Sequence, residues 1–100
     1  MHRRYGECYF GRTDVHTEVA RGQQFVSELA TAPPEAIANY KVVGVETLDG
    51  TKLLFADESW LLFRQSGTEP VLRLYSEATS TDKMRSLLQE AGAFVNSLRS

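Results

Sequence analysis

The succession of short strand-like segments between residues 41 and 78 constrains the fold more than any other feature of this sequence. Each segment is rich in valine, leucine or aromatic residues and is bounded by turn residues; the segments are Lys41–Leu48, Thr51–Ala56, Trp60–Arg64 and Val71–Ala78. The dipeptide Asp49-Gly50 predicts a tight hairpin turn between the first two. Strands joined by such short connections favour an antiparallel sheet.

An earlier strand and a first helix precede this series. The aromatic residues of Tyr5–Val15 predict a strand in which the rings pack rather than bind ligand. A helix is predicted from Thr17, acting as its cap, to about Ala30, because apolar residues recur there at helical spacing. Ala32-Pro33-Pro34 ends it, and the stretch to Asn39 is predicted as a connection.

A second helix closes the chain. Thr79-Ser80-Thr81-Asp82 provides hydroxyl caps and an acidic first turn. The apolar residues that follow form one stripe, which a sheet would cover: Met84, Leu87, Leu88, Ala91, Phe94, Val95 and Leu98. The order strand, helix, four strands, helix predicts a single α+β domain over residues 1–100, with a mostly antiparallel sheet and both helices on one face.

Charge and composition exclude several classes of function. The formal net charge of -2 provides no general attraction to nucleic acid or to an anionic membrane surface. No apolar run approaches the roughly 20 residues that span a bilayer. A single cysteine, Cys8, excludes an internal disulfide and fits a reducing compartment, and with only His2 and His16 as histidines no metal-ligand cluster is predicted. A cytoplasmic protein is expected, in which any anion site is local.

The segment between the last two predicted strands concentrates donors for an anion. It holds Arg64 and Arg73, the hydroxyls of Ser66 and Thr68, and Gly67, which lets the backbone approach a ligand and adopt a positive φ. A phosphate dianion needs this combination of forked donors, hydroxyls and backbone N–H groups. The acidic pair at Asp57-Glu58, in contrast, is predicted to be a solvated turn rather than an acid–base pair.

The strand pattern also predicts how the two arginines are placed. If Arg64 lies opposite Val71, then Arg64 and Arg73 are diagonal neighbours on one face, roughly 7 to 8 Å apart. Alternate residues, among them Leu61, Phe63, Leu72 and Leu74, then point to the core. The arginines would stay accessible to a phosphate.

These residues resemble the C-terminal domain of the phosphoglucomutase/phosphomannomutase family of phosphohexomutases. The motif is Arg64-x-Ser66-Gly67-Thr68-Glu69-Pro70-x-x-Arg73, with Ser59-Trp60-Leu61-Leu62 before it and Tyr75-Ser76-Glu77-Ala78 after it. The likeness covers essentially the whole chain and implies a TATA-box-binding-protein-like fold. It also implies that the motif binds the phosphate of a hexose phosphate, through Arg64, Ser66, Gly67, Thr68 and Arg73, with Glu69 orienting an arginine or accepting loop N–H bonds.

In that family a phosphoserine and a magnesium-binding acidic loop, both on other domains, carry out an intramolecular phosphoryl transfer between hexose 1- and 6-phosphates. This sequence contains neither element, and no base lies near Ser66 to activate it as a nucleophile. The resemblance therefore implies the C-terminal domain of a longer enzyme. By itself this domain would have no catalytic residue and no metal, would bind glucose or mannose phosphate without turnover, and would work with other domains of the parent chain.

Two other interpretations fit the same residues. The chain is alternatively a stand-alone module that uses the loop to bind phosphorylated proteins or nucleotides without catalysis. It is, in a third interpretation, a protein-interaction domain whose arginines are surface charges paired with Glu69 and Glu77. The sequence does not separate glucose, mannose and glucosamine phosphates, because the resemblance places the specificity loop outside this chain.

Overall fold

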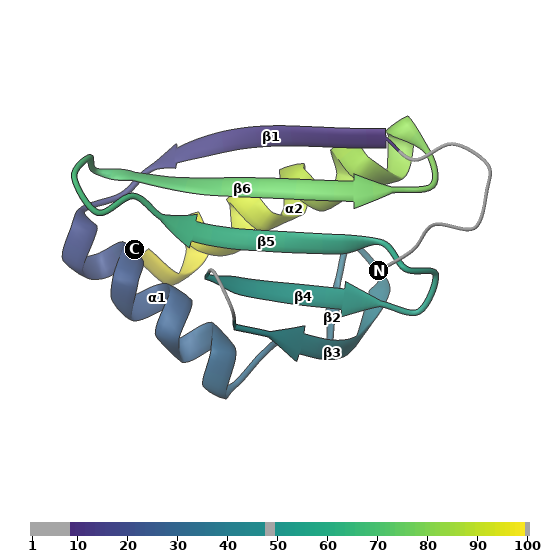
Figure 1. The fold of residues 1–100 in the computed structure, drawn as a ribbon, viewed down its shortest axis with the longest axis horizontal. Coiled ribbons are helices and arrows are strands. Elements are labelled where there is room, and N and C mark those ends of the chain that lie inside the picture. Colours follow the sequence, from purple (N-terminus) through teal and green to yellow (C-terminus); the bar gives the residue numbers. More distant parts are fainter. Residues whose placement is uncertain (1–8, 48–49, 100) are drawn as a thin grey trace.

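The computed structural model describes residues 9–47 and 50–99, with side chains as far as Asn96. Figure 1 shows one curled sheet with the two helices packed against it. The elements in order are β1 (Tyr9–His16), α1 (Val19–Thr31), β2 (Ala36–Ile37), β3 (Tyr40–Glu46), β4 (Thr51–Phe55), β5 (Trp60–Gln65), β6 (Val71–Ala78) and α2 (Thr81–Arg99). The α+β prediction is confirmed, and the arrangement is that of a TATA-box-binding-protein-like domain.

Every neighbouring pair of strands in the sheet is antiparallel. The strand order is β1-β6-β5-β4-β3-β2, so the first described strand lies beside the last one. The segment predicted as a plain connection contains the two-residue strand β2, which pairs with the start of β3. Ile37 in β2 is only 5% exposed. Two residues are too few to show a period, so the sequence pattern did not reveal this strand.

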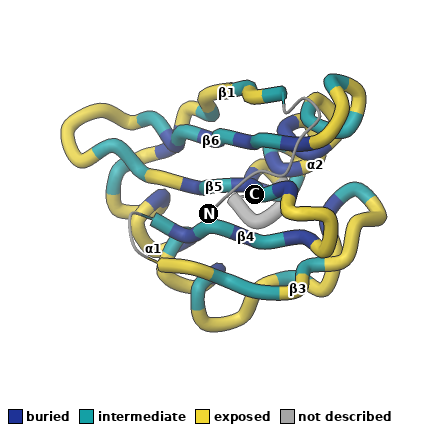
Figure 2. The backbone as a smooth tube through the Cα atoms, turned by 45° about the vertical axis from the view of Figure 1, so that its right-hand side comes forward, coloured by how far each residue is buried: buried dark blue, intermediate teal, exposed yellow. Residues whose placement is uncertain are grey.

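The core lies between the sheet and the helices. Leu61 and Phe63 of β5 and Leu72 and Leu74 of β6 are fully buried, as the alternation predicted. Figure 2 shows this alternation along the central strands, with exposed residues in the turns, along β1 and β3 and on the outer helix surfaces. The helices contribute Phe25, Leu29, Leu87, Leu88, Ala91 and Val95 to the same core. Both helices therefore cover one face, and no helix formed by residues 9–47 or 50–99 covers the opposite face, which is called the helix-free face below.

The helix starts differ from one another. The prediction that Thr17 caps α1 is wrong, because the N-cap residue is Glu18 and no side chain caps the helix. Thr17 is instead 2% exposed, and its backbone N–H donates to the Pro70 carbonyl at 2.8 Å. The hydroxyl cap of α2 is confirmed, because Ser80 Oγ accepts the Lys83 N–H at 3.1 Å.

Some predicted features fall on parts of the chain outside the description. Cys8, His2 and the first part of the predicted Tyr5–Val15 strand lie there, and so do Leu48 and Asp49. Gly50, the second residue of the predicted turn, has φ +114°, a conformation that favours glycine. Within the described ranges, neither helix is long and apolar enough to cross a membrane.

The helix-free face carries aromatic rings near the start of β5. Phe10 is 58% exposed, and its ring lies 6.1 Å from those of Trp60 and Tyr75, measured between centroids. Lys52 Nζ lies 4.8 Å from the centre of the Trp60 ring. The predicted packing of the β1 aromatics thus holds for Phe10, although it packs at the surface rather than in the core.

Candidate anion-binding site

Residues 66–70 form a short loop between β5 and β6 at one end of the sheet. The loop closes through the Ser66 N–H, which donates to the Val71 carbonyl at 3.0 Å, and the Val71 N–H, which donates to the Glu69 carbonyl at 2.7 Å. The bond from Thr17 to Pro70 ties the loop to the segment before α1. Residues 67–70 are exposed. The loop is therefore anchored at its base and accessible at its tip.

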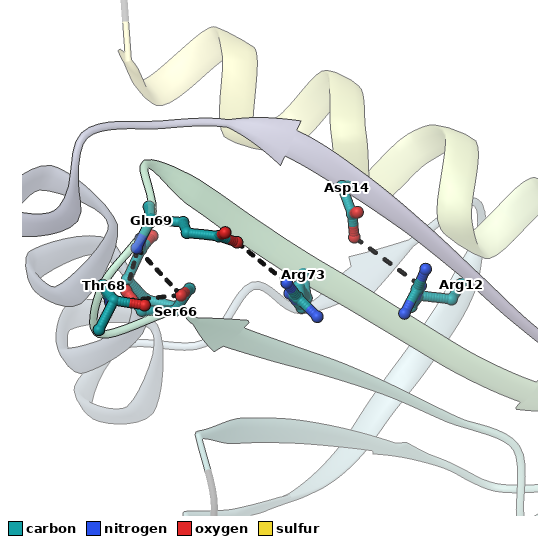
Figure 3. Close-up of polar contacts among 7 residues, drawn as sticks. Arg12, Asp14, Ser66, Thr68, Glu69 and Arg73 are labelled. Carbon is teal, nitrogen blue, oxygen red and sulfur yellow. Dashed lines mark hydrogen bonds and ion pairs between the residues drawn. The ribbon is translucent and has the colours of Figure 1, made fainter.

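The Ser66 hydroxyl oxygen gathers two backbone donors of the loop. Ser66 Oγ accepts the N–H of Thr68 at 3.3 Å and the N–H of Glu69 at 3.2 Å, as Figure 3 shows. The two N–H groups thus point to the same side of the loop, toward the Ser66 hydroxyl. The Ser66 proton remains to be donated to a further acceptor. Among the described residues no side-chain base is hydrogen-bonded to Ser66. That its hydroxyl acts as a hydrogen-bond donor to an anion stays a prediction.

The register of β5 and β6 places the two arginines directly opposite each other. Arg64 pairs with Arg73, not with Val71, so the predicted register is wrong by two residues. The hydrogen bond from Ser66 to Val71 closes the loop and determines this pairing. Because a shift of two residues preserves the face, both arginines do lie on the helix-free face, as predicted. Their Cα atoms are about 4.5 to 5.5 Å apart, closer than the diagonal arrangement would give.

Arg73 is only partly neutralised. Its Nη2 lies 3.4 Å from Glu69 Oε1 (Figure 3), and the two side chains are 33% and 61% exposed. The Nε of Arg73 is buried and has no hydrogen-bond partner. Asp14, opposite Arg73 on β1, is paired with Arg12 at 3.9 Å. Glu69 therefore contacts an arginine, but a pair this long and exposed is weak, and its role in orienting Arg73 stays a prediction.

Arg64 is exposed, and no ion pair is recorded for it within the described part of the chain. It borders a pocket of about 420 Å³ between α1 and the start of β4, which leaves space beside it. The other residues that line this pocket are Gln23, Val26, Ser27, Ala30, Thr47, Gly50, Thr51 and Gln65. Like charges directly opposite on a sheet repel, so an anion beside this pair would relieve the repulsion.

The predicted positive φ of Gly67 is not found. Gly50 is the glycine with a positive φ among the described residues, so the loop does not use Gly67 for that conformation. A Cβ built at Gly67 would meet no heavy atom within 4 Å. The tip of the loop is thus open on that side. Close approach of a ligand to the Gly67 backbone stays a prediction.

The sequence did not reveal the roles of Gln65 and Thr17, which hydrogen-bond to backbone carbonyls of the loop. Gln65 Nε2 donates to the carbonyls of Ser66 and Glu69 at 3.1 and 3.2 Å. The available signal was a polar residue at a position of β5 where the alternation calls for an apolar one. Nothing in the sequence near Thr17 indicated its contact with Pro70, because the two are distant along the chain.

The turn at the opposite end of β5 holds a cation in a different way. Lys83 is 10% exposed, is paired with Asp57, and lies with its Nζ 4.1 Å from the centre of the Tyr40 ring. Burial raises the pKa of Asp57, but hydrogen bonds from Lys83 and Ser59 outweigh it and bring that pKa below its ordinary value of 3.8. Asp57, predicted as a purely solvated residue, is thus a structural ion-pair partner.

No metal centre is formed by the residues that the structure describes. Nowhere among them do three histidine, cysteine, aspartate or glutamate side chains gather closely enough to hold an ion. The donors at the loop are guanidinium, hydroxyl and N–H groups, which bind anions and not cations.

Comparison with known proteins places these observations in a family. The family model described as "Phosphoglucomutase/phosphomannomutase, C-terminal domain" matches residues 17–92, a range that includes the loop and both arginines. The chain belongs to this family. The resemblance inferred from the motif is thereby confirmed.

Individual phosphohexomutases are similar to parts of the chain. A phosphoglucomutase/phosphomannomutase of Thermococcus kodakarensis is 47% identical over 53 residues, which are 53% of this chain and 11% of that protein. A probable phosphoglucosamine mutase of Methanosphaera stadtmanae is 36% identical over 52 residues, 52% of this chain and 12% of the relative. A probable phosphoglucosamine mutase of Pyrococcus furiosus is 35% identical over 60 residues, which are 60% of this chain and 13% of that protein. The matches thus span little more than a tenth of each relative.

Proposed function

We propose that this chain is the phosphate-binding domain of a phosphohexomutase, an enzyme that interconverts hexose 1- and 6-phosphates. The loop at 66–70, together with Arg64 and Arg73, would hold the phosphate that is not being transferred. The observation that carries the proposal is the direct pairing of Arg64 with Arg73 on the helix-free face, beside a loop whose N–H groups converge on one oxygen. Membership of the family supports it.

Each group of the site would have a distinct task. The two guanidinium groups would neutralise the dianion, and the Ser66 hydroxyl and the backbone N–H groups of the loop would donate to its oxygens. Thr68 Oγ1 and the Gly67 backbone, both exposed at the tip, would complete the contacts. Binding the inert phosphate in this way would position the reacting end of the sugar, so that energy from a remote contact lowers the barrier elsewhere.

The reaction itself would require residues outside this chain. The family relatives are about eight to nine times longer than the segments that match, as their coverage of 11 to 13% indicates. We infer that the phosphorylated serine and the magnesium ion belong to other domains of a longer, cytoplasmic enzyme. By itself the chain would bind hexose phosphate weakly, with a Kd on the order of millimolar, and would not turn it over.

An amide titration tests this proposal. Glucose 6-phosphate, added to the ¹⁵N-labelled chain, should shift the backbone signals of residues 64–73 in a saturable way. Unphosphorylated glucose serves as the control and should leave them unchanged. No shift at tens of millimolar, or equal shifts with both sugars, would refute phosphate binding by the loop.

The identity of the sugar is a separate question. The relatives named above are a phosphoglucomutase/phosphomannomutase and two probable phosphoglucosamine mutases. Because the loop contacts only the phosphate in this proposal, glucose, mannose and glucosamine 6-phosphates should bind the isolated chain with nearly equal affinity. A preference above about threefold for one of them would show that this domain also reads the sugar.

A stand-alone module for other phosphorylated ligands is the competing proposal. It predicts that a phosphoserine peptide or a nucleotide binds the same amides more tightly than any hexose phosphate does. The two proposals therefore separate in one competition experiment on the same labelled chain.

A further inference from the structure

Gln65 occupies a position where the sheet pattern calls for an apolar residue. It is the last residue of β5 and follows the fully buried Leu61 and Phe63 on the core-facing side of the strand. Its side chain is half-buried beneath the loop, and its Oε1 is buried without a hydrogen-bond partner. A polar group held in such a place needs a reason, because an unsatisfied buried acceptor is unfavourable.

The amide of Gln65 joins the two ends of the loop. Its Nε2 donates to the Ser66 carbonyl at 3.1 Å and to the Glu69 carbonyl at 3.2 Å. Both acceptors are carbonyl oxygens, so the NH₂ group and not the oxygen must face them. One side chain thus holds the carbonyls of the first and fourth loop residues at a single point on the core side.

Gly22 of α1 provides the space for this side chain. A Cβ built at Gly22 would lie 1.6 Å from Gln65 Oε1, 2.4 Å from Cδ and 3.0 Å from Cγ. All three of the nearest atoms belong to Gln65. Glycine weakens a helix interior relative to alanine. The requirement of Gln65 for space explains why the helix contains glycine at this buried position.

We propose that Gln65 is a positioning residue of the phosphate site and that Gly22 provides the space that its side chain needs. By holding the Ser66 and Glu69 carbonyl oxygens on the core side, Gln65 keeps their negative ends away from an incoming anion. By tying the first and fourth loop residues together, Gln65 also keeps the loop in the closed shape in which the N–H groups of Thr68 and Glu69 donate to Ser66 Oγ. The inference rests on the proposed function for the identity of the ligand, but the loop contacts themselves are independent of it.

The first test needs no ligand. Gln65→Leu keeps a side chain of similar size but removes the donors, and Gln65→Glu keeps the length but replaces the donors with oxygen. In both variants hydrogen exchange at the Thr68 and Glu69 amides should be about tenfold faster than in the wild-type chain. The core amides of β6 should be unchanged, which would show that the fold is intact. Unchanged loop exchange in both variants would overturn the proposal.

The second test is a double-mutant cycle that combines substitutions at Gly22 and Gln65. Gly22→Ala alone should lower Tm and speed loop exchange, because the new methyl group displaces Gln65. In a Gln65→Ala background the clashing atoms are absent, so the same Gly22→Ala change should raise Tm by a few degrees through helix propensity and leave loop exchange unaltered. An effect of the same sign and size in both backgrounds would show that Gly22 does not serve Gln65.

The third test connects the loop to phosphate. With glucose 6-phosphate as the probe, Gln65→Leu should bind about tenfold more weakly than the wild-type chain while Tm changes by only a few degrees. If the wild-type chain itself shows no phosphate-dependent shift, the proposed function fails, whatever Gln65 does. If the wild-type chain binds and Gln65→Leu binds equally well, the function stands and the positioning role fails.

Discussion

Cationic side chains lie at both ends of β5, one at the start and two at the end, and their surroundings are opposite. At the start of the strand Lys83 is enclosed, with 10% of its side chain exposed, between the Asp57 carboxylate and the Tyr40 ring. At the end of the strand Arg64 is exposed and Arg73 has one long contact with Glu69. Both ends also place a serine in the turn. Lys83 is enclosed by its protein partners, whereas Arg64 and Arg73 are not.

The difference separates a cation with a structural role from cations that are accessible from solvent. Lys83 connects α2 to β3 and to the turn before β5, so its partners come from elements that it fastens together. Arg73 has its carboxylate partner four residues away on the adjoining loop, where the pair fastens nothing distant. A cation that fulfils no tertiary role and faces an equal charge is available to a ligand.

The largest expected effect concerns the arginines. Arg64→Ala and Arg73→Ala should each weaken glucose 6-phosphate binding by about 10- to 100-fold, because a charge-assisted hydrogen bond contributes about 1.5 to 3 kcal/mol. Tm should change little. Arg85→Ala, an exposed arginine on α2, is the matched control and should bind normally. Isothermal or NMR titration measures the affinities. An equal loss of affinity in Arg85→Ala would show that Arg64 and Arg73 act only through the overall surface charge.

Lys83→Met should give the reverse outcome. The methionine keeps the apolar stem but removes the ion pair with Asp57 and the contact with Tyr40, so the free energy of unfolding should fall by about 1 kcal/mol. For a chain of this size Tm should fall by about 4 to 8 °C. Phosphate affinity should stay within twofold. Thermal unfolding followed by circular dichroism measures the first quantity, and weakened phosphate binding would contradict the separation of the two ends.

Glu69→Gln should strengthen phosphate binding slightly. The Glu69 carboxylate occupies Arg73 and repels an anion, and an exposed pair of this kind contributes about 0.2 to 1 kcal/mol. Its removal should therefore raise the affinity by about two- to fivefold at low salt, with the gain shrinking as salt is added. Weaker binding in this variant would instead show that Glu69 is needed to orient Arg73.

The smallest effect is the response of the enclosed pair to acid. Because the pKa of Asp57 is lowered in the folded chain, its carboxylate stabilises the fold above the ordinary value of 3.8 and loses that contribution as the pH falls below it. The wild-type chain should exceed Asp57→Asn in Tm at pH 7, and the gap should close as the pH falls below 3.8. A gap that widens on acidification would contradict the lowered pKa.

The faces of the strands and the stripe of α2 were predictable from sequence for a simple reason. Side chains alternate along a strand, and they repeat every three to four residues along a helix, whatever the rest of the chain does. Leu61, Phe63, Leu72 and Leu74 were therefore assigned to the core correctly. The donors of the loop were recognisable because they are adjacent in sequence, so their chemistry was visible before any pairing was known.

The register, the short strand β2 and the start of α1 were not predictable in the same way. Shifting one strand by two residues changes no face, so the periodic pattern fits Arg64 opposite Val71 as well as Arg64 opposite Arg73. Thr17 was taken for a cap because its residue type suits one. Its actual contact with Pro70 spans more than fifty residues of sequence, and no local rule detects such a contact.

The sequence by itself determined the fold class, the family and the set of groups offered to an anion, since local periodicity and a contiguous motif carry that information. Only the tertiary structure decided which of those groups face one another. The opposed arginines, the support of the loop by Gln65 over Gly22 and the enclosure of Lys83 all join segments that are separate in the chain. The pairing of the arginines follows from the hairpin register, and the positions of Gln65 and Lys83 follow from packing the helices on the sheet, which is a property of the whole molecule.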